Sequence, residues 1–184
     1  MEHKEPHLLH IFIKGLKRIM PGTLIAAAVL GMLFFFMIPA QIVLVVKTVK
    51  SEQTVLCARM TDGEEWAVSY IHSVNKRPVY DYLRIEGTQL RILRSRYDAF
   101  GAGMPEVSSP ENPLRVGPDG WLEYTVNRLV PDVAIFVGRV AGHVLHLKGR
   151  EIPFVSLAKP GQALRFSVEK QTLRQTLGGG CLAP

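Results

Sequence analysis

The segment from Trp66 to Leu83 puts a histidine and an acid on two neighbouring stretches with strand character. A four-residue loop over residues 75–78, a common hairpin length, sets His72 directly opposite Asp81. Apolar side chains alternate on the same face, so we expect it to be the core face. The pair predicts one of three arrangements: a hydrogen-bonded pair that closes the hairpin, a ligand contact at the mouth of the domain, or part of a metal site.

A metal site needs a third ligand, and His143 is the candidate because it alternates with two leucines that we expect to point inward. His72, Asp81 and His143 would then serve a metal-assisted hydrolase. The other hypothesis for His143 is a structural histidine. Ser73 cannot readily act as a nucleophile with His72, because adjacent strand residues point to opposite faces.

A basic strand and a glycine turn form the second motif. Arg94 and Arg96 end a strand-forming stretch that leads into the sequence GAGMP, which contains Gly101, Gly103 and Pro105. Two glycines permit positive φ angles, and successive backbone N–H groups there can hold a carboxylate or phosphate. The alternative is a tight corner or bulge. The following proline-rich loop is long enough to be a lid or a docking surface.

The elements that must position these residues are short strands. From residue 41 onward the apolar residues follow a period of two between turn residues, and no window has the pattern of an amphipathic helix. We therefore expect an all-β domain, an antiparallel β-sandwich or barrel. The predicted strands are 42–49, 54–60, 65–73, 79–86, 89–97, 121–127, 133–137, 142–147, 152–157 and 163–169.

Residues 23–38 form an uncharged apolar run, TLIAAAVLGMLFFFMI, that predicts one N-terminal transmembrane helix. Basic residues precede it, so the N-terminus is expected in the cytoplasm and the rest of the chain outside, on a bacterial inner membrane. Pro39 and the β-branched residues 42–46 favour a helix that ends near Pro39 and leads directly into the sheet. A signal peptide cleaved after Ala40 is the alternative.

These patterns divide the chain into four parts. They are a basic cytoplasmic N-terminus (1–21), a transmembrane signal-anchor (22–40), an exported β-domain (41–170) and a flexible Gly-rich tail (171–184). The net charge of +6 is scattered and does not favour nucleic-acid binding. Cys57 and Cys181 are the two cysteines; they can pair in an oxidising compartment, but they lack the CxxC spacing of a metal site.

Both motifs resemble those of one bacterial family, the domain of unknown function DUF1850, whose members are short exported proteins. The resemblance covers about residues 42–169 and rests on a HSV sequence, a Pro-Val pair with a following acid, the GAGMP turn and a later strand histidine. Asn75 stands where the family often has an acid, and Asp81 stands where Glu is common, which would weaken a cation site. The matching residues are His72, Ser73, Val74, Pro78, Val79, Asp81, Gly101, Ala102, Gly103, Pro105 and His143.

The resemblance implies no known reaction and no cofactor. In their genetic context, family members are similar to accessory proteins that are encoded beside TAXI-type tripartite (TRAP) transporters. This implies a membrane-bound helper in the import of small organic anions. We therefore expect a membrane-anchored protein that binds a TRAP permease or solute-binding subunit and is not an enzyme. Candidate binding residues are His72, Ser73, Asp81, Arg94, Arg96, Gly101, Gly103, Pro105 and His143. The alternatives are the metal-dependent hydrolase and an envelope factor that recognises lipid or cell wall.

Overall fold

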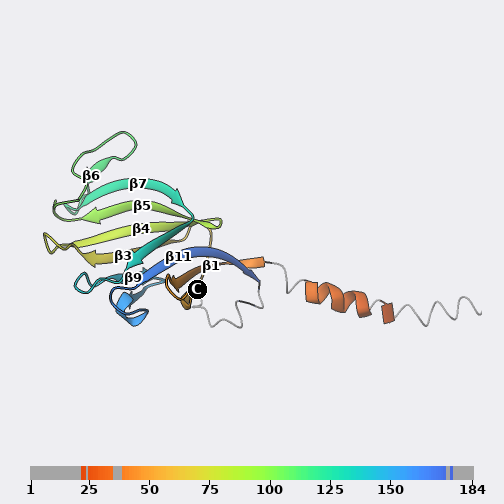
Figure 1. Ribbon diagram of the computed structural model, residues 1–184. Coiled ribbons are helices and arrows are strands. Elements are labelled where there is room, and N and C mark those ends of the chain that lie inside the picture. Colours follow the sequence, from red (N-terminus) through yellow and green to blue (C-terminus); the bar gives the residue numbers. More distant parts are fainter. Residues whose placement is uncertain (1–21, 24, 35–38, 173–174, 176–184) are drawn as a thin grey trace, which may run out of the picture.

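A computed structural model of the chain describes residues 22–23, 25–34, 39–172 and 175 (Figure 1). The described β-domain consists of antiparallel strands in two sheets, which confirms the all-β prediction. The strands are β1 (Pro39–Thr48), β2 (Thr54–Met60), β3 (Glu65–Ile71), β4 (Pro78–Glu86), β5 (Gln89–Tyr97), β6 (Leu114–Val116), β7 (Leu122–Val130), β8 (Asp132–Phe136), β9 (Val144–Leu147), β10 (Arg150–Pro153) and β11 (Ala163–Thr172), with a 3₁₀ turn, η1 (Phe154–Ser156), after β10.

The two sheets differ in size, and the larger one extends beyond the smaller. The four-stranded sheet has the order β2-β1-β11-β8, and the seven-stranded sheet has the order β10-β9-β3-β4-β5-β7-β6. The edge strand β8 contacts β5 of the other sheet. Figure 1 shows β6 and β7 on the side of the large sheet away from β1 and β11. The inner face near β5 and β7 is therefore only partly covered by the second sheet.

The core between the sheets follows from the alternation of apolar residues. Side chains of β1, β2 and β11 pack against those of β3, β4 and β9 in one buried cluster. Trp66 and Phe166 stack across it with ring centroids 5.3 Å apart, and Phe154 lies 5.5 Å from Phe166. A smaller cluster, with Val79 and Tyr97 buried, lies on the inner face of the large sheet.

Each of the ten predicted strands overlaps a strand of the structure, but most of their ends differ by one or more residues. β2 and β5 have the predicted ends, and β1 confirms that residues 42–46 are strand and do not continue a helix. The short strand β6 was not predicted; it lies inside the segment interpreted as a proline-rich loop. Residues 154–156 form η1, where the prediction continued a strand.

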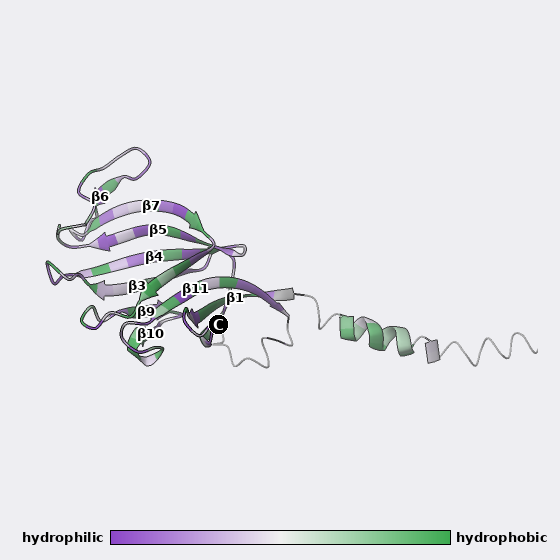
Figure 2. Ribbon diagram, viewed as in Figure 1, coloured by the Kyte–Doolittle hydropathy of each residue, from purple (hydrophilic) through white to green (hydrophobic). Residues whose placement is uncertain are grey.

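Residues 22–23 and 25–34 are helical, and the side chains described there are exposed. Figure 2 shows this helix as predominantly hydrophobic. Within the described ranges we find no helix that is both long and apolar enough to cross a membrane. Residues 35–38 and 1–21 lie outside those ranges, so the transmembrane span stays a prediction. Cys57 on β2 is disulfide-bonded, and Cys181 lies outside the described residues.

Candidate binding site at the hairpin end

The β3–β4 hairpin has a different register from the predicted one. Tyr70 pairs with Val79 and Val68 pairs with Asp81, so the loop covers residues 72–77 and Pro78 already belongs to β4. The loop closes through a hydrogen bond from the His72 N–H to the Arg77 carbonyl, 2.9 Å long. The predicted opposition of His72 and Asp81 is wrong. The observed register differs from the predicted one by an even number of residues, so the predicted inner face of both strands is correct.

His72 is consequently a loop residue and not a partner of Asp81. It lies four residues beyond Val68, which faces Asp81, and four residues of strand span about 13 Å. Its Nδ1 accepts a weak hydrogen bond, 3.4 Å long, from the Val74 N–H. Among the described residues, no three His, Cys, Asp or Glu side chains come together as a metal site. The structure therefore separates the predicted set of His72, Asp81 and His143.

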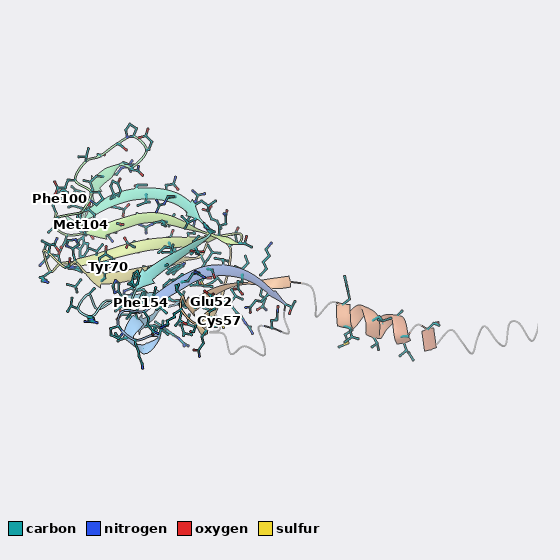
Figure 3. The ribbon with its side chains drawn as sticks, in the orientation of Figure 1. Glu52, Cys57, Tyr70, Phe100, Met104 and Phe154 are labelled. Carbon is teal, nitrogen blue, oxygen red and sulfur yellow. The ribbon has the colours of Figure 1, made fainter. Side chains whose placement is uncertain are left out.

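The β3–β4 loop packs against the segment that leads into the glycine turn. Asn75 donates from Nδ2 to the carbonyl oxygens of Ala99 and Phe100, both at 3.3 Å. Arg77 forms a two-pronged ion pair with Asp98. The two motifs of the sequence, which are about 25 residues apart, thus form one structural unit. Figure 3 shows Phe100, Met104 and Tyr70 at this end of the molecule.

The glycine turn is a tight corner, one of the two predicted alternatives. The Met104 N–H donates to the Gly101 carbonyl at 2.9 Å, and Gly103 has φ +85°. A positive φ at the third position of such a turn favours glycine. The Tyr97 hydroxyl donates to the Pro105 carbonyl at 2.6 Å and ties the end of the turn to the inner face of the sheet. The turn therefore connects the outer loops to the interior of the sandwich.

Arg94 and Arg96 lie on the outer face of the large sheet, away from Asp81. Arg94 stacks over the Tyr82 ring and Arg96 lies over Trp121. Each guanidinium also has acidic partners; the shortest contact joins Arg96 and Asp119 at 2.6 Å. Their positive charges are therefore already balanced locally. Their predicted contact with an anion stays a prediction.

A row of side chains crosses the inner face of the large sheet and has a polar centre. The residues Tyr124, Ser95, Asp81, Val68 and Leu145 face one another in that order across β7, β5, β4, β3 and β9. The Ser95 hydroxyl donates to the Asp81 carboxylate at 2.5 Å. This acid is half-buried, and burial raises its pKa, although the Ser95 hydrogen bond opposes the shift.

Val68, Asp81 and Ser95 of this row border a half-enclosed cavity of about 420 Å³ between the sheets. Its apolar walls come from Val68, Leu83, Ile92, Val126, Val133 and Ile135, and its polar groups are those of Tyr70, Asp81, Ser95, Arg128 and His143. β8 supplies the wall on the side of the small sheet. An apolar cavity of this size with a few converging polar groups has the usual character of a small-molecule site.

His143 faces this cavity from the segment before β9. Its ring lies between Tyr70 and Phe154, with centroid distances of 5.5 and 5.4 Å. The Nδ1 atom accepts a hydrogen bond from the Gly138 N–H at 3.3 Å. Burial lowers the pKa of His143, which favours the neutral ring with its proton on Nε2. Burial and the Asp81 carboxylate raise the pKa of Tyr70 to about 12, so its hydroxyl stays protonated.

Residues 66–154 match the family model described as Domain of unknown function (DUF1850). Residues 66–154 therefore belong to the DUF1850 family. No curated protein and no solved structure matches the chain.

The DUF1850 segment includes the large sheet from β3 through β10 and all the candidate residues of both motifs. Of these candidates, the structure brings Asp81 and His143 to one cavity. It places Gly101, Gly103 and Pro105 in the turn beside the hairpin loop, where His72 and Ser73 also lie.

Sequence reasoning missed Ser95, Tyr70 and Arg128 as cavity residues. One signal for Ser95 was present. Arg91 and Arg94 are both suited to an outer face, yet a spacing of three residues would put them on opposite faces of a regular strand. In the structure both point outward. The β4–β5 ladder is irregular at this point, with Leu93 as the extra residue, and this bulge turns Ser95 toward Asp81.

Proposed function

We propose that this protein is a membrane-anchored, extracytoplasmic accessory protein that binds a protein partner and is not an enzyme. The proposed partner is a permease or solute-binding subunit of a TAXI-type TRAP importer for small organic anions. The identity of the partner rests on the resemblance of the two motifs to their family. The mode of action rests on one surface of the DUF1850 domain.

Exposed apolar side chains at the hairpin end carry the proposal. Ile71, Val74, Phe100 and Val140 expose 41%, 62%, 48% and 82% of their surface, and we call these four residues the distal apolar surface. The hairpin segment with Ile71 and Val74 is hydrogen-bonded to each of the other two segments, through the Ile71 N–H to Ala141 and the Asn75 amide to Phe100. Clustered apolar side chains in solvent are typical of interaction sites.

The loops beneath this surface are held in place before any partner arrives. The Arg77–Asp98 ion pair and the Asn75 hydrogen bonds fix the hairpin loop to the start of the glycine turn. A preorganised surface loses less conformational entropy on binding. This favours a docking role for the distal apolar surface.

The position of the surface fits a protein tethered at its N-terminus. β1 enters the sandwich at the end opposite to the β3–β4 loop (Figure 1). The exposed apolar helix over residues 25–34 supports membrane insertion ahead of β1. A domain tethered in this way would present the distal apolar surface to a partner that rises from the membrane or lies beyond it.

Site-specific crosslinking tests the proposal. A photoreactive phenylalanine replaces Val74 in the full chain, in cells that make a TAXI-type TRAP system, and the same residue replaces Val155 as a control. Val155 is 60% exposed but lies on η1. We expect a TRAP permease or solute-binding subunit to crosslink at position 74 and not at 155. Membrane insertion of the full chain without any TRAP subunit crosslinked at position 74 would refute the proposal.

A further inference from the structure

The cavity at Asp81 combines aliphatic walls with a single acid, and the proposed docking role does not explain this combination. Six of its lining side chains are aliphatic, and the acid at its inner wall is Asp81. Within the described part of the chain, the Asp81 carboxylate forms no ion pair, and its recorded hydrogen-bond partner is Ser95. A carboxylate can accept about four hydrogen bonds. A half-buried acid next to aliphatic walls is therefore short of donors, which is costly in free energy.

The groups around Asp81 do not supply the missing positive charge. His143 is kept neutral by burial, and its Nδ1 already accepts from Gly138. Arg128 is exposed and lies on β7 opposite Ile92, at the opening of the cavity. The aromatic ring of Tyr70 lines the same cavity as the acid, and the imidazole of His143 packs against that ring. Aromatic rings attract organic cations through their faces.

We propose that this cavity binds a small organic amine in its ammonium form. The ammonium group donates to Asp81, beside Ser95, and lies against the ring of Tyr70. The apolar part of the ligand packs on the aliphatic side chains of β5, β7 and β8. Arg128 at the opening can pair with a carboxylate on the same ligand, so amino acids with apolar side chains fall within this class.

The size of the site limits the class further. A cavity of about 420 Å³ lies near the lower end of the range for small-molecule sites, which excludes a large polymer as its occupant. The alternation of the sheet keeps the outer-face arginines from entering it. A ligand that carries only negative charge would meet the Asp81 carboxylate without a basic group on the inner wall.

Three probes of equal shape test the inference: cyclohexylmethylamine, cyclohexylmethanol and cyclohexanecarboxylate. Each is titrated by calorimetry at pH 8 into the full chain, purified in detergent. We expect the amine to bind at least about tenfold more tightly than either of the others, because its ammonium pairs with the half-buried Asp81 carboxylate. Equal or tighter binding of the alcohol or the carboxylate overturns the inference, as does the absence of binding by all three.

Two variants locate the binding. Asp81→Asn keeps the shape and removes the charge, so we expect the amine to lose about tenfold in affinity and the alcohol to lose none. Asp119→Asn is the matched control, because Asp119 pairs with Arg96 on the outer face. An amine affinity that falls in Asp119→Asn and not in Asp81→Asn would place the site elsewhere and refute the inference. Crosslinking at Val74 is a separate measurement and does not decide this result.

Discussion

Asn75 and Gly101 come from different loops, yet a β-carbon on the glycine would lie only 2.8 Å from the amide nitrogen of the asparagine. The same amide group donates to the carbonyls of Ala99 and Phe100, so it cannot move away without losing hydrogen bonds. Gly101 has no positive φ angle and is required for space alone. In this chain the contact therefore couples the packing of the GAGMP turn to that of the hairpin loop.

We therefore expect Gly101→Ala to destabilise the domain by about 1–3 kcal/mol, the usual range for an overpacked contact. The measurement is urea denaturation of the full chain in detergent, followed by tryptophan fluorescence. Asn75→Ala removes the obstacle, so Gly101→Ala should cost clearly less in that background than in the wild type. Equal costs in the two backgrounds would show that Asn75 does not restrict position 101.

The turn motif illustrates how far the sequence predicts the structure. The period of two predicted both faces of β3 and β4 correctly, because alternation is local to each strand. It could not predict the register, which depends on how the loop closes. Lys76 has φ +56°, an uncommon angle for a residue with a side chain, and this allows the loop over residues 72–77. Composition alone does not indicate that conformation, and the four-residue loop that it favours sets His72 opposite Asp81.

Local sequence patterns could not predict the cavity, for a different reason. Its wall on β8 lies against strands that come from earlier parts of the chain, and the pairing of sheets is a long-range property. Asp81 and His143 could still be recognised separately as polar residues on inward faces. They line one cavity because β9 pairs with β3, which brings His143 against Tyr70. No spacing in the sequence specifies that pairing.

Asp81 should reduce stability at neutral pH. Its folded-state pKa is raised above the ordinary value of 3.8 by burial, so the unfolded chain loses its proton first as the pH rises. The free energy of unfolding should accordingly fall from about pH 4 upward until the folded-state pKa is passed. Asp81→Asn removes this loss. We expect the variant to melt at a higher temperature than the wild type at pH 7.5, and the difference to shrink as the pH approaches 4.

Calorimetric melting of both proteins across this pH range measures the effect. A lower melting temperature of Asp81→Asn at pH 7.5, with folding otherwise intact, would mean that the acid has a stabilising partner. Glu169→Gln is a suitable control, since Glu169 is a partly exposed acid paired with Lys47 at 2.7 Å.

Ser95 should stabilise the domain only while Asp81 is present as an acid. Ser95→Ala removes the 2.5 Å hydrogen bond and leaves the carboxylate without its recorded donor. We expect a loss of about 1–3 kcal/mol at pH 7.5, because an unsatisfied buried acceptor costs more than an average hydrogen bond. Denaturation midpoints of Ser95→Ala, Asp81→Asn and the double variant give the coupling between the two residues.

Ser69→Ala is the matched control for this cycle. Ser69 lies on the outer face of β3, where its hydroxyl is 2.7 Å from Nε2 of His146. Its loss should be smaller, about 0.5–1.5 kcal/mol, and should be independent of Asp81. A Ser95→Ala cost that persists unchanged in the Asp81→Asn background would contradict the role assigned to this hydrogen bond.

His143 should remain neutral, with its proton on Nε2, throughout the physiological pH range. Burial lowers its folded-state pKa below the ordinary value of 6.5, and Nδ1 accepts from the Gly138 N–H. As the pH falls below 6.5, the unfolded chain takes up a proton before the folded one, so this histidine should make stability fall with falling pH. His143→Phe retains an aromatic ring between Tyr70 and Phe154 but does not titrate. The unfolding free energy of this variant should therefore vary less between pH 7.5 and 5 than that of the wild type. Nitrogen-15 NMR of the wild type at pH 7 should show Nδ1 of His143 unprotonated. A protonated Nδ1 would instead mean that Gly138 does not donate to this ring.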